Sequence, residues 1–279
     1  MKKISRRSFL AAAGLSVAAL ALTACGGSSA STASSVASSA ASSEAASTSA
    51  AAGELATVEA GKLTMATNAA FPPYEMTTDA GEFEGIDIET AQAIADKLGL
   101  ELQIDDMDFD AALLSVQQGK ADIVMAGVTV TDERKAVMDF SDSYATGIQS
   151  IIVPEGSDIA SPDDLAGKKI GTQRGTTGYI YCSDDFGDDN VVAYDDGLTA
   201  VQALNNGQVD AVVIDNAPAK EYVAANPGLA ILDTSYAEED YAIGMAKGSS
   251  LEAAVNAALE ELKADGTLQA IVDKYITAE

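Results

Sequence analysis

Apolar and polar positions follow two different periods along the part of the chain that begins near residue 54. Short, mainly apolar runs at 62–67 and 121–126 predict strands, of which the second is buried. Apolar residues spaced three and four apart predict helices over 87–98 and 109–118. Because strands that alternate with helices are typical of parallel sheets covered on both faces, we predict an α/β fold of mainly parallel sheets flanked by helices.

One pattern of nine residues occurs twice. Residues 119–127 (GKADIVMAG) have a counterpart in residues 207–215 (GQVDAVVID), and each follows a helical stretch rich in Ala, Leu and Gln. A shorter likeness links residues 62–67 with residues 168–172. Helix–turn–strand order produces such echoes by itself in α/β proteins, but the two echoes together predict two lobes of similar architecture.

The C-terminal segment completes the first lobe in this interpretation. Its apolar spacing predicts helices over 251–264 and 267–276 and no further strand. The chain would then cross between the lobes near 146–150 and near 241–245, and two crossings make a hinge. The predicted division is therefore lobe 1 from residues 54–147 plus 244–279, and lobe 2 from residues 148–243.

The N-terminal quarter of the chain carries a different pattern. Four basic residues among the first seven precede an apolar run over 9–22, which is too short to span a bilayer, since spanning takes about 20 apolar residues. A basic start and a short apolar run are typical of an export signal, so we predict a signal peptide over residues 1–24. The order SRRSFL at 5–10 resembles a twin-arginine signal, but general export signals also carry adjacent arginines, and both routes stay open.

The apolar run closes on Leu-Thr-Ala-Cys, with the cysteine at position 25. This order resembles a bacterial lipobox, in which the cysteine is acylated; the alternative is a plain cleavage site with a chance cysteine. Ser, Ala, Thr and Gly make up almost all of the next segment, a composition that is typical of a disordered tether. We predict that residues 25–53 are a lipidated Cys25 and a flexible linker, which anchor the protein to the outer face of the cell membrane.

Composition and charge exclude several classes of function. The chain has 43 acidic and 16 basic residues, and a net charge of −27 does not suit a nucleic-acid partner. Histidine is absent, so Ser-His, Cys-His and histidine–metal chemistry are excluded, and we expect neither a metal nor a cofactor. If Cys25 is acylated, Cys182 has no disulfide partner, and we interpret it as a small buried apolar group.

Candidate ligand contacts follow the predicted strands, because ligands bind beyond the carboxyl ends of strands in open α/β sheets. Two prolines stiffen the loop at 68–74 and would fix Phe71 and Tyr74, although aromatic residues also plug core edges. Arg134 falls in the first turn of a predicted helix, where a cation is disfavoured by the helix dipole. An anionic ligand would explain its position; a salt bridge to the neighbouring acidic residues is the alternative.

Lobe 2 supplies two further candidates. The glycine-rich loop at 171–178 follows a strand and opens a helix, so its backbone donors suit an anion, but it lacks the lysine of a P-loop and the dinucleotide fingerprint. Asp215 ends a strand and either caps the next helix or faces a ligand. A cleft with Arg134 on one side and Asp215 on the other fits a zwitterion, whose carboxylate and ammonium those two residues would bind.

Several motifs carry a resemblance to a known family. They are AFPPYE at 70–75, GIDIE at 85–89, AGVTVTDER at 126–134, FS at 140–141 and GTTG at 175–178. The chain resembles, over residues 63–276, the polar amino-acid-binding proteins of ABC importers. That resemblance implies a two-lobed, hinged periplasmic-binding-protein fold. It also implies a monomeric extracytoplasmic receptor, not an enzyme, that captures an L-α-amino acid by closure and passes it to a membrane permease.

The resemblance also implies a set of ligand contacts. They are Asn68, Phe71, Phe109, Gly127, Thr129, Arg134, Gln173, Thr176 and Asp215. Arg134, Thr129 and Thr176 would bind the ligand carboxylate. Asp215 and the carbonyl of Gly127 would bind the ammonium, and the two phenylalanines would enclose the side chain.

Departures from the family pattern bear on specificity. Family members that bind cationic amino acids often carry Asp at the position of Asn68, so a neutral or polar ligand is favoured. Some glutamine-binding relatives have His and Lys where Ile214 and Gln173 stand, so glutamine is not assured. Arg174 either favours an acidic side chain or faces solvent.

Two alternatives use the same fold. A cyclohexadienyl-type dehydratase would need an acid–base residue over its substrate, and Glu75 or Asp215 are the candidates. The lipid tether and the lack of histidine argue against it. A sensory ligand-binding module is normally fused to a transmembrane signalling region, which the sequence does not contain.

Overall fold

The computed structural model describes residues 55–276, so the predicted signal peptide, Cys25 and the linker lie outside the described residues. Five strands form sheet 1, in the order β5-β1-β6-β14-β7. They are β1 (Lys62–Thr67), β5 (Glu101–Asp106), β6 (Ile123–Val124), β7 (Met138–Phe140) and β14 (Gly244–Ala246). The first three pair in parallel, whereas β14 runs antiparallel to both of its neighbours.

Sheet 2 repeats this arrangement in the order β10-β9-β11-β8-β12, with β13 also paired to β8. Its strands are β8 (Ala145–Pro154), β9 (Ile170–Gln173), β10 (Val191–Tyr194), β11 (Ala211–Asp215), β12 (Leu229–Ile231) and β13 (Ala237–Tyr241). Strands β10, β9 and β11 are parallel, and β8 is antiparallel to its partners. Each sheet therefore has a parallel part, as predicted, and an antiparallel part that the sequence pattern did not predict.

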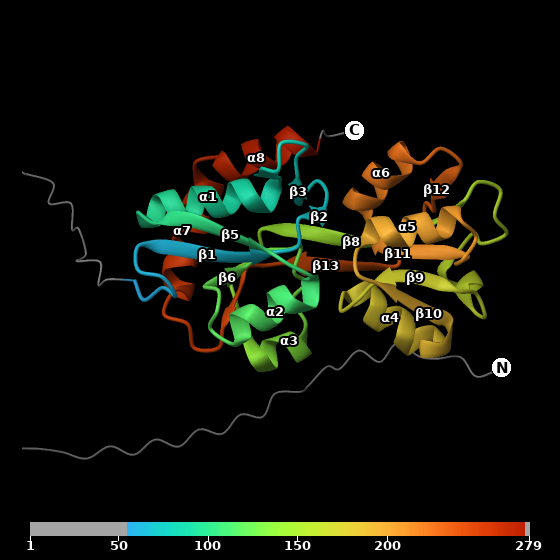
Figure 1. The fold of residues 1–279 in the computed structure, drawn as a ribbon, viewed down its shortest axis with the longest axis horizontal. Coiled ribbons are helices and arrows are strands. Elements are labelled where there is room, and N and C mark those ends of the chain that lie inside the picture. Colours follow the sequence, from blue (N-terminus) through green and yellow to red (C-terminus); the bar gives the residue numbers. More distant parts are fainter. Residues whose placement is uncertain (1–54, 277–279) are drawn as a thin grey trace, which may run out of the picture. The chain divides into compact units, whose positions relative to one another are not determined.

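Helices cover both faces of each sheet (Figure 1). Sheet 1 carries α1 (Ile86–Leu98), α7 (Glu252–Ala264) and α8 (Thr267–Tyr275) on one face, and α2 (Phe109–Gln117) with the short α3 (Asp132–Val137) on the other. Sheet 2 lies between α4 (Thr177–Phe186) on one side and α5 (Gly197–Asn205) and α6 (Asn216–Ala225) on the other. Each sheet with its helices makes one lobe of the predicted two-lobed α/β fold.

Smaller elements complete the lobes. A third sheet pairs β2 (Ala70–Phe71), β3 (Glu75–Thr77) and β4 (Phe83–Glu84), and 3₁₀ turns occur at Pro162–Leu165 and Asp188–Asn190. The predicted helices agree with the structure to within one residue at each end. The strand predicted at 121–126 is shorter, since only Ile123–Val124 pairs as β6.

The sequence repeat of residues 119–127 and 207–215 has a structural basis. Asp122 Oδ2 accepts a hydrogen bond from the backbone N–H of Thr64 at 2.8 Å, and Asp210 Oδ2 accepts one from Lys169 N–H at 2.8 Å. Each aspartate thus ties the loop before its own strand to the start of the neighbouring strand. The two repeats have the same local structure because the aspartate satisfies a backbone donor at a strand end.

Strands β8 and β13 connect the two lobes and run antiparallel side by side, with Ala145 opposite Tyr241. The chain leaves sheet 1 after β7, enters β8, and returns from β13 to β14. The second predicted crossing, at 241–245, coincides with the return. The first one, at 146–150, falls inside β8, just after the connection. The exact lobe boundaries remain a prediction.

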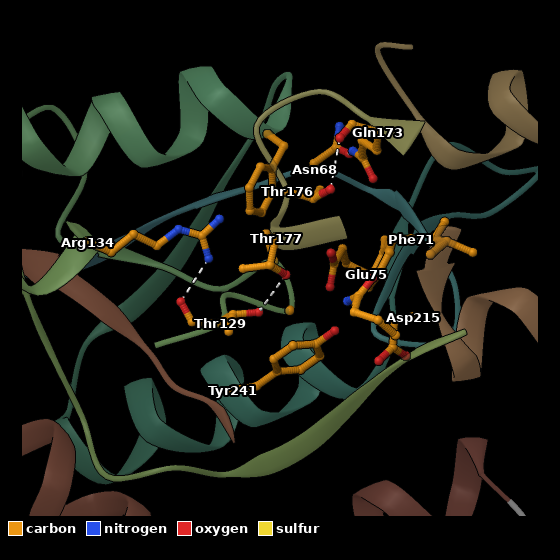
Figure 2. Close-up of a pocket in the computed structure, with 15 residues that line it drawn as sticks. Asn68, Phe71, Glu75, Thr129, Arg134, Gln173, Thr176, Thr177, Asp215 and Tyr241 are labelled. Carbon is orange, nitrogen blue, oxygen red and sulfur yellow. Dashed lines mark hydrogen bonds between the residues drawn. The ribbon is translucent and has the colours of Figure 1, made fainter. Parts of the chain in front are cut away.

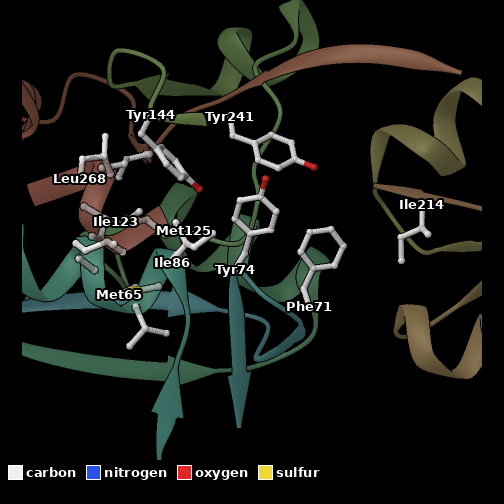
Figure 3. Close-up of a cluster of buried hydrophobic side chains, with 14 of the residues drawn as sticks. Met65, Phe71, Tyr74, Ile86, Ile123, Met125, Tyr144, Ile214, Tyr241 and Leu268 are labelled. Atoms are coloured by element: carbon white, nitrogen blue, oxygen red, sulfur yellow. The ribbon is translucent and has the colours of Figure 1, made fainter. Parts of the chain in front are cut away.

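An aromatic row joins the core of lobe 1 to the connecting strands (Figure 3). The rings of Phe71 and Tyr74 stack at 5.9 Å between centroids, and Tyr74 meets Tyr241 edge-on at 5.4 Å. Tyr74 and Tyr241 are buried in the main core cluster.

Cys182 is buried in the core of lobe 2, where burial raises the pKa of its thiol to about 12, as expected for an apolar role. None of the helices of residues 55–276 is long and apolar enough to cross a membrane.

Gly147 in β8 lies directly against the ring of Tyr241. A Cβ atom at this position would lie 2.4 Å from Tyr241 Cζ, and the ring is too buried to move away. We expect Gly147→Ala to lower the free energy of unfolding by about 1–3 kcal/mol through overpacking. Urea unfolding measures this change. Thr146→Ala, on the exposed side of the same strand, is the control, and equal effects of the two substitutions would contradict this packing argument.

Candidate ligand-binding site

One pocket, with an empty volume of about 390 Å³, is lined by residues from both lobes (Figure 2). The pocket is lined by Asn68, Phe71, Glu75, Phe109, Ala126, Gly127, Thr129, Arg134, Gln149, Gln173, Thr176, Thr177, Ile214, Asp215 and Tyr241. All nine predicted ligand contacts are in this lining.

The lining residues come together because of where the parallel strands end. Asn68 follows β1, Gly127 comes shortly after β6, Gln173 ends β9 and Asp215 ends β11. The carboxyl ends of the two parallel sets face one pocket, which is the arrangement expected for open α/β sheets.

Arg134 is buried at the wall of the pocket, with 8% of its surface exposed. The helix α3 begins at Asp132, and its cap Thr131 accepts a hydrogen bond from the backbone N–H of Arg134 at 3.2 Å. The guanidinium donates to the carbonyls of Thr129 at 2.8 Å and Gly175 at 3.1 Å, and its carbon lies 5.4 Å from the centre of the Phe109 ring. The alternative role, a surface salt bridge to neighbouring acids, does not fit a buried guanidinium.

Asp215 serves as a helix cap and also lines the pocket. Its Oδ1 accepts from Ala217 N–H at 2.9 Å, which caps α6, and its Oδ2 accepts from Ile148 N–H at 2.7 Å. The carboxylate is 2% exposed, and burial raises its pKa to about 6, although the two N–H groups oppose this shift. The predicted cap is therefore present, and the same carboxylate is available to a cation in the pocket.

Pocket residues of the two lobes already bond to one another. Asn68 Oδ1 accepts from Gln173 Nε2 at 2.8 Å, and Arg134 reaches the carbonyl of Gly175. The Thr176 hydroxyl caps α4 by accepting from Tyr179 N–H at 3.3 Å and donates to the carbonyl of Gln173. The structure therefore has the lobes in contact around the pocket.

A buried carboxylate on β13 stands behind the pocket wall. Glu239 Oε2 accepts from the hydroxyls of Thr129 at 3.1 Å and Thr177 at 2.9 Å, and from Gln149 Nε2 at 3.0 Å. The two threonine hydroxyls lie 3.4 Å apart (Figure 2). Glu239 thus links one residue of lobe 1, one of lobe 2 and one of the connecting strand β8.

Glu75 adds a buried carboxyl group to the lining. It is fully buried, and neither of its oxygens has a hydrogen-bond partner among the described residues. Burial raises its pKa well above the usual value, and the nearby charge of Asp87 acts in the same direction. Asp87 itself accepts from Gly127 N–H at 3.0 Å, and burial raises its pKa to about 6. A ligand group with N–H donors would satisfy Glu75.

Sequence reasoning missed some of these residues. It considered Glu75 only as an acid for the dehydratase alternative, although the residue stands in the AFPPYE motif. Thr177, Gln149 and Tyr241 gave no separate signal as pocket residues. Arg174 does not line the pocket; its exposed side chain lies 3.6 Å from Asp195, so of its two predicted roles the solvent-facing one fits.

Residues 63–278 match the family described as bacterial extracellular solute-binding proteins, family 3. The chain belongs to this family. As a member of an extracellular family, this solute-binding protein functions outside the cytoplasm. The resemblance found in the sequence is thereby confirmed, and membership in a family of solute-binding proteins favours a receptor over the dehydratase alternative.

Two relatives and one solved structure illustrate the similarity of this solute-binding protein to known proteins. It is 34% identical over 226 residues to the L-cystine-binding protein TcyJ of Escherichia coli K12, covering 79% of this chain and 85% of the relative. It is 33% identical to a probable histidine-binding protein of Neisseria gonorrhoeae, covering 96% and 95%. The arginine-, lysine-, histidine-binding protein ArtJ of Geobacillus stearothermophilus superposes with a TM-score of 0.75 at 35% identity, covering 78% of this chain and 96% of ArtJ.

A pH-dependent stability follows from the burial of Asp215. Its pKa rises from 3.8 to about 6 on folding, so between these values the folded protein holds a proton that the unfolded chain releases. This group therefore stabilises the ligand-free protein as the pH falls from 7 to 5, by about 1 kcal/mol. Asp215→Asn removes the titration, and urea unfolding at both pH values should show a correspondingly smaller gain. Equal gains in the variant and the wild type would refute the shift.

Proposed function

We propose that this solute-binding protein captures an L-α-amino acid outside the cytoplasm and delivers it to the permease of an ABC transporter. The observation that carries the proposal is the convergence of a buried guanidinium from lobe 1 and a buried carboxylate from lobe 2 on one pocket. An amino acid is a zwitterion with the complementary charges. Relatives named for binding cystine, histidine and arginine support this class of ligand.

The proposed orientation follows from the charges. The ligand carboxylate faces Arg134, whose guanidinium bonds to two backbone carbonyls within residues 55–276 and has N–H groups left for an anion. The ammonium faces Asp215 and the carbonyl of Gly127. Phe71 and Phe109 enclose the side chain. The ligand contacts retained from the sequence, including Asn68, Thr129, Gln173 and Thr176, complete the proposed site.

Closure of the lobes completes the site in this proposal. Each lobe holds only part of the ligand, so only the closed state gains every contact. The hydrogen bond between Asn68 and Gln173 joins the lobes at 2.8 Å and supports a closed state of this kind. Four or five polar and aromatic contacts, less the costs of association and closure, give about −8 kcal/mol, or micromolar affinity. The proposed lobes are residues 54–147 plus 244–279 and residues 148–243.

Glu75 narrows the class of side chain. The preference for neutral ligands rested on the amide of Asn68, but that amide is already bonded to Gln173 and to the carbonyl of Met107. Glu75 supplies a buried carboxyl group in the same lining, and neither of its oxygens has a hydrogen-bond partner among the described residues. The proposed ligand side chain therefore ends in a nitrogen group that donates hydrogen bonds, such as a guanidinium or an amide.

The attachment to the membrane belongs to the same proposal. A lipid on Cys25 would hold the protein, acting as a monomer, at the outer face of the cell membrane close to the permease. Mass spectrometry of the protein extracted from membranes would detect the acylated N-terminal cysteine. An unmodified N-terminus beyond position 25 would argue for free secretion.

Arg134→Ala tests the carboxylate contact. Loss of two charge-assisted hydrogen bonds should lower the affinity for the preferred amino acid at least about a hundredfold in isothermal titration calorimetry. Arg174→Ala is the matched control, because Arg174 carries the same charge beside the pocket without lining it. Wild-type affinity of the Arg134 variant would disprove the proposed site.

Glu75→Gln tests the class of side chain. If Glu75 binds a cationic group, the substitution should lower the affinity for L-arginine by about tenfold and change the affinity for L-glutamine far less. Glu82→Gln, an exposed residue of the hairpin between β3 and β4, is the control. Unchanged affinities for both amino acids in the Glu75 variant would remove Glu75 from the site.

A further inference from the structure

Glu239 is a buried carboxylate that neither the family motifs nor the predicted ligand contacts include. It lies on the connecting strand β13, is 7% exposed, and does not itself line the pocket. Three donors converge on its Oε2, while its Oε1 is buried without a hydrogen-bond partner among the described residues. Glu239 Oε2 is therefore the common hydrogen-bond acceptor of Thr129, Gln149 and Thr177.

The hydroxyl protons of the two threonines are committed to this carboxylate. A threonine hydroxyl has one proton to donate and two lone pairs to accept with. Thr129 and Thr177 both lie within hydrogen-bond distance of Glu239 Oε2, and bonds to a charged acceptor are the stronger ones. The two hydroxyl oxygens lie 3.4 Å apart. Because both hydroxyl protons point to Glu239, neither lies between these two oxygens. Both hydroxyls line the pocket, and only their acceptor lone pairs remain for a ligand.

The charge of Glu239 reaches both ends of the proposed ligand. Burial lowers the pKa of the Arg134 guanidinium, and several nearby groups oppose this effect. The charge of Glu239 makes the largest contribution among them. It also raises the pKa of the Asp215 carboxyl, beside which the ligand ammonium would lie. With Glu239 ionised, the wall next to Arg134 is less favourable to a carboxylate alone and more favourable to an ammonium.

We propose that Glu239 is a specificity-determining residue of the binding site: by keeping Thr129 and Thr177 as hydrogen-bond acceptors beside Arg134, it makes the site require an ammonium next to the ligand's carboxylate. This inference rests on the proposed function. It changes the role of Thr129, whose hydroxyl accepts from the ammonium and does not donate to the carboxylate. The carboxylate is left to Arg134 and to the backbone N–H groups at the start of α4.

Glu239→Gln tests the inference with pairs of ligands that differ only in the α-ammonium. One pair is L-arginine and 5-guanidinopentanoic acid, and the other is L-glutamine and glutaramic acid. The variant keeps the size of the side chain but removes its charge, and its amide can donate to a threonine and release a hydroxyl proton. Calorimetry should show weaker binding of the amino acid and stronger binding of the des-amino acid. The dissociation constant of the des-amino acid divided by that of the amino acid should therefore fall about tenfold or more, the effect expected for one charge-assisted contact.

The controls separate this role from a structural one. Glu238→Gln makes the same charge change at an exposed position of the same strand, and its ratio should equal that of the wild type. Glu239→Asp keeps the charge and should retain most of the discrimination. Thr177→Val removes one acceptor and should lower the ratio without a change at residue 239, which keeps the test valid if the Gln variant does not fold.

The outcomes are distinguishable. If Glu239→Gln weakens the amino acid and its des-amino analogue by the same factor, Glu239 is a structural tie between the lobes and the inference is wrong. If the wild-type protein binds neither L-cystine nor any of the twenty standard amino acids, the proposed function fails, and the inference fails with it.

Discussion

Buried charge around one pocket is the constraint on which the rest of this structure depends. The guanidinium of Arg134 and the carboxyl groups of Glu75, Asp215 and Glu239 are withdrawn from water within or directly behind the same wall. A buried charge without a partner costs several kcal/mol, so such a cluster persists only if something completes it. Within the protein, carbonyls, backbone N–H groups and hydroxyls complete it in part. In the proposed function, an amino acid with a nitrogen-bearing side chain would supply the charges and donors that remain.

The fold explains why these groups meet. Both lobes end their parallel strands at the pocket, and the paired strands β8 and β13 join one lobe to the other beside it. Glu239 lies on the same strand as Tyr241, whose ring packs on Gly147 and Tyr74. The contacts that hold the connecting strands together are therefore neighbours of the contacts that position the ligand. In the proposed mechanism, closure of the lobes would therefore accompany occupation of the pocket.

Much of this was predictable from the sequence, for physical reasons. Apolar periodicity reports burial directly, so the strand at 62–67 and the helix that follows it were predicted closely. Arg134 stood out because a cation in a first helical turn is unfavourable. Glu239 could not be found in this way. It sits in an acidic stretch that looks solvated, and it is buried only because β13 pairs with β8 in a register that places it opposite Gly147. Glu75 likewise owes its burial to a strand of three residues, too short for a periodic signal.

A crystal structure of the wild-type protein with an L-amino acid bound tests most directly whether Arg134 and Asp215 recognise the two ends of a zwitterion. The predicted result places the ligand carboxylate about 3 Å from the guanidinium of Arg134 and the ammonium about 3 Å from the carboxylate of Asp215, with both lobes in contact. A ligand bound in the reverse orientation, or in a cavity that excludes these two residues, would contradict that recognition.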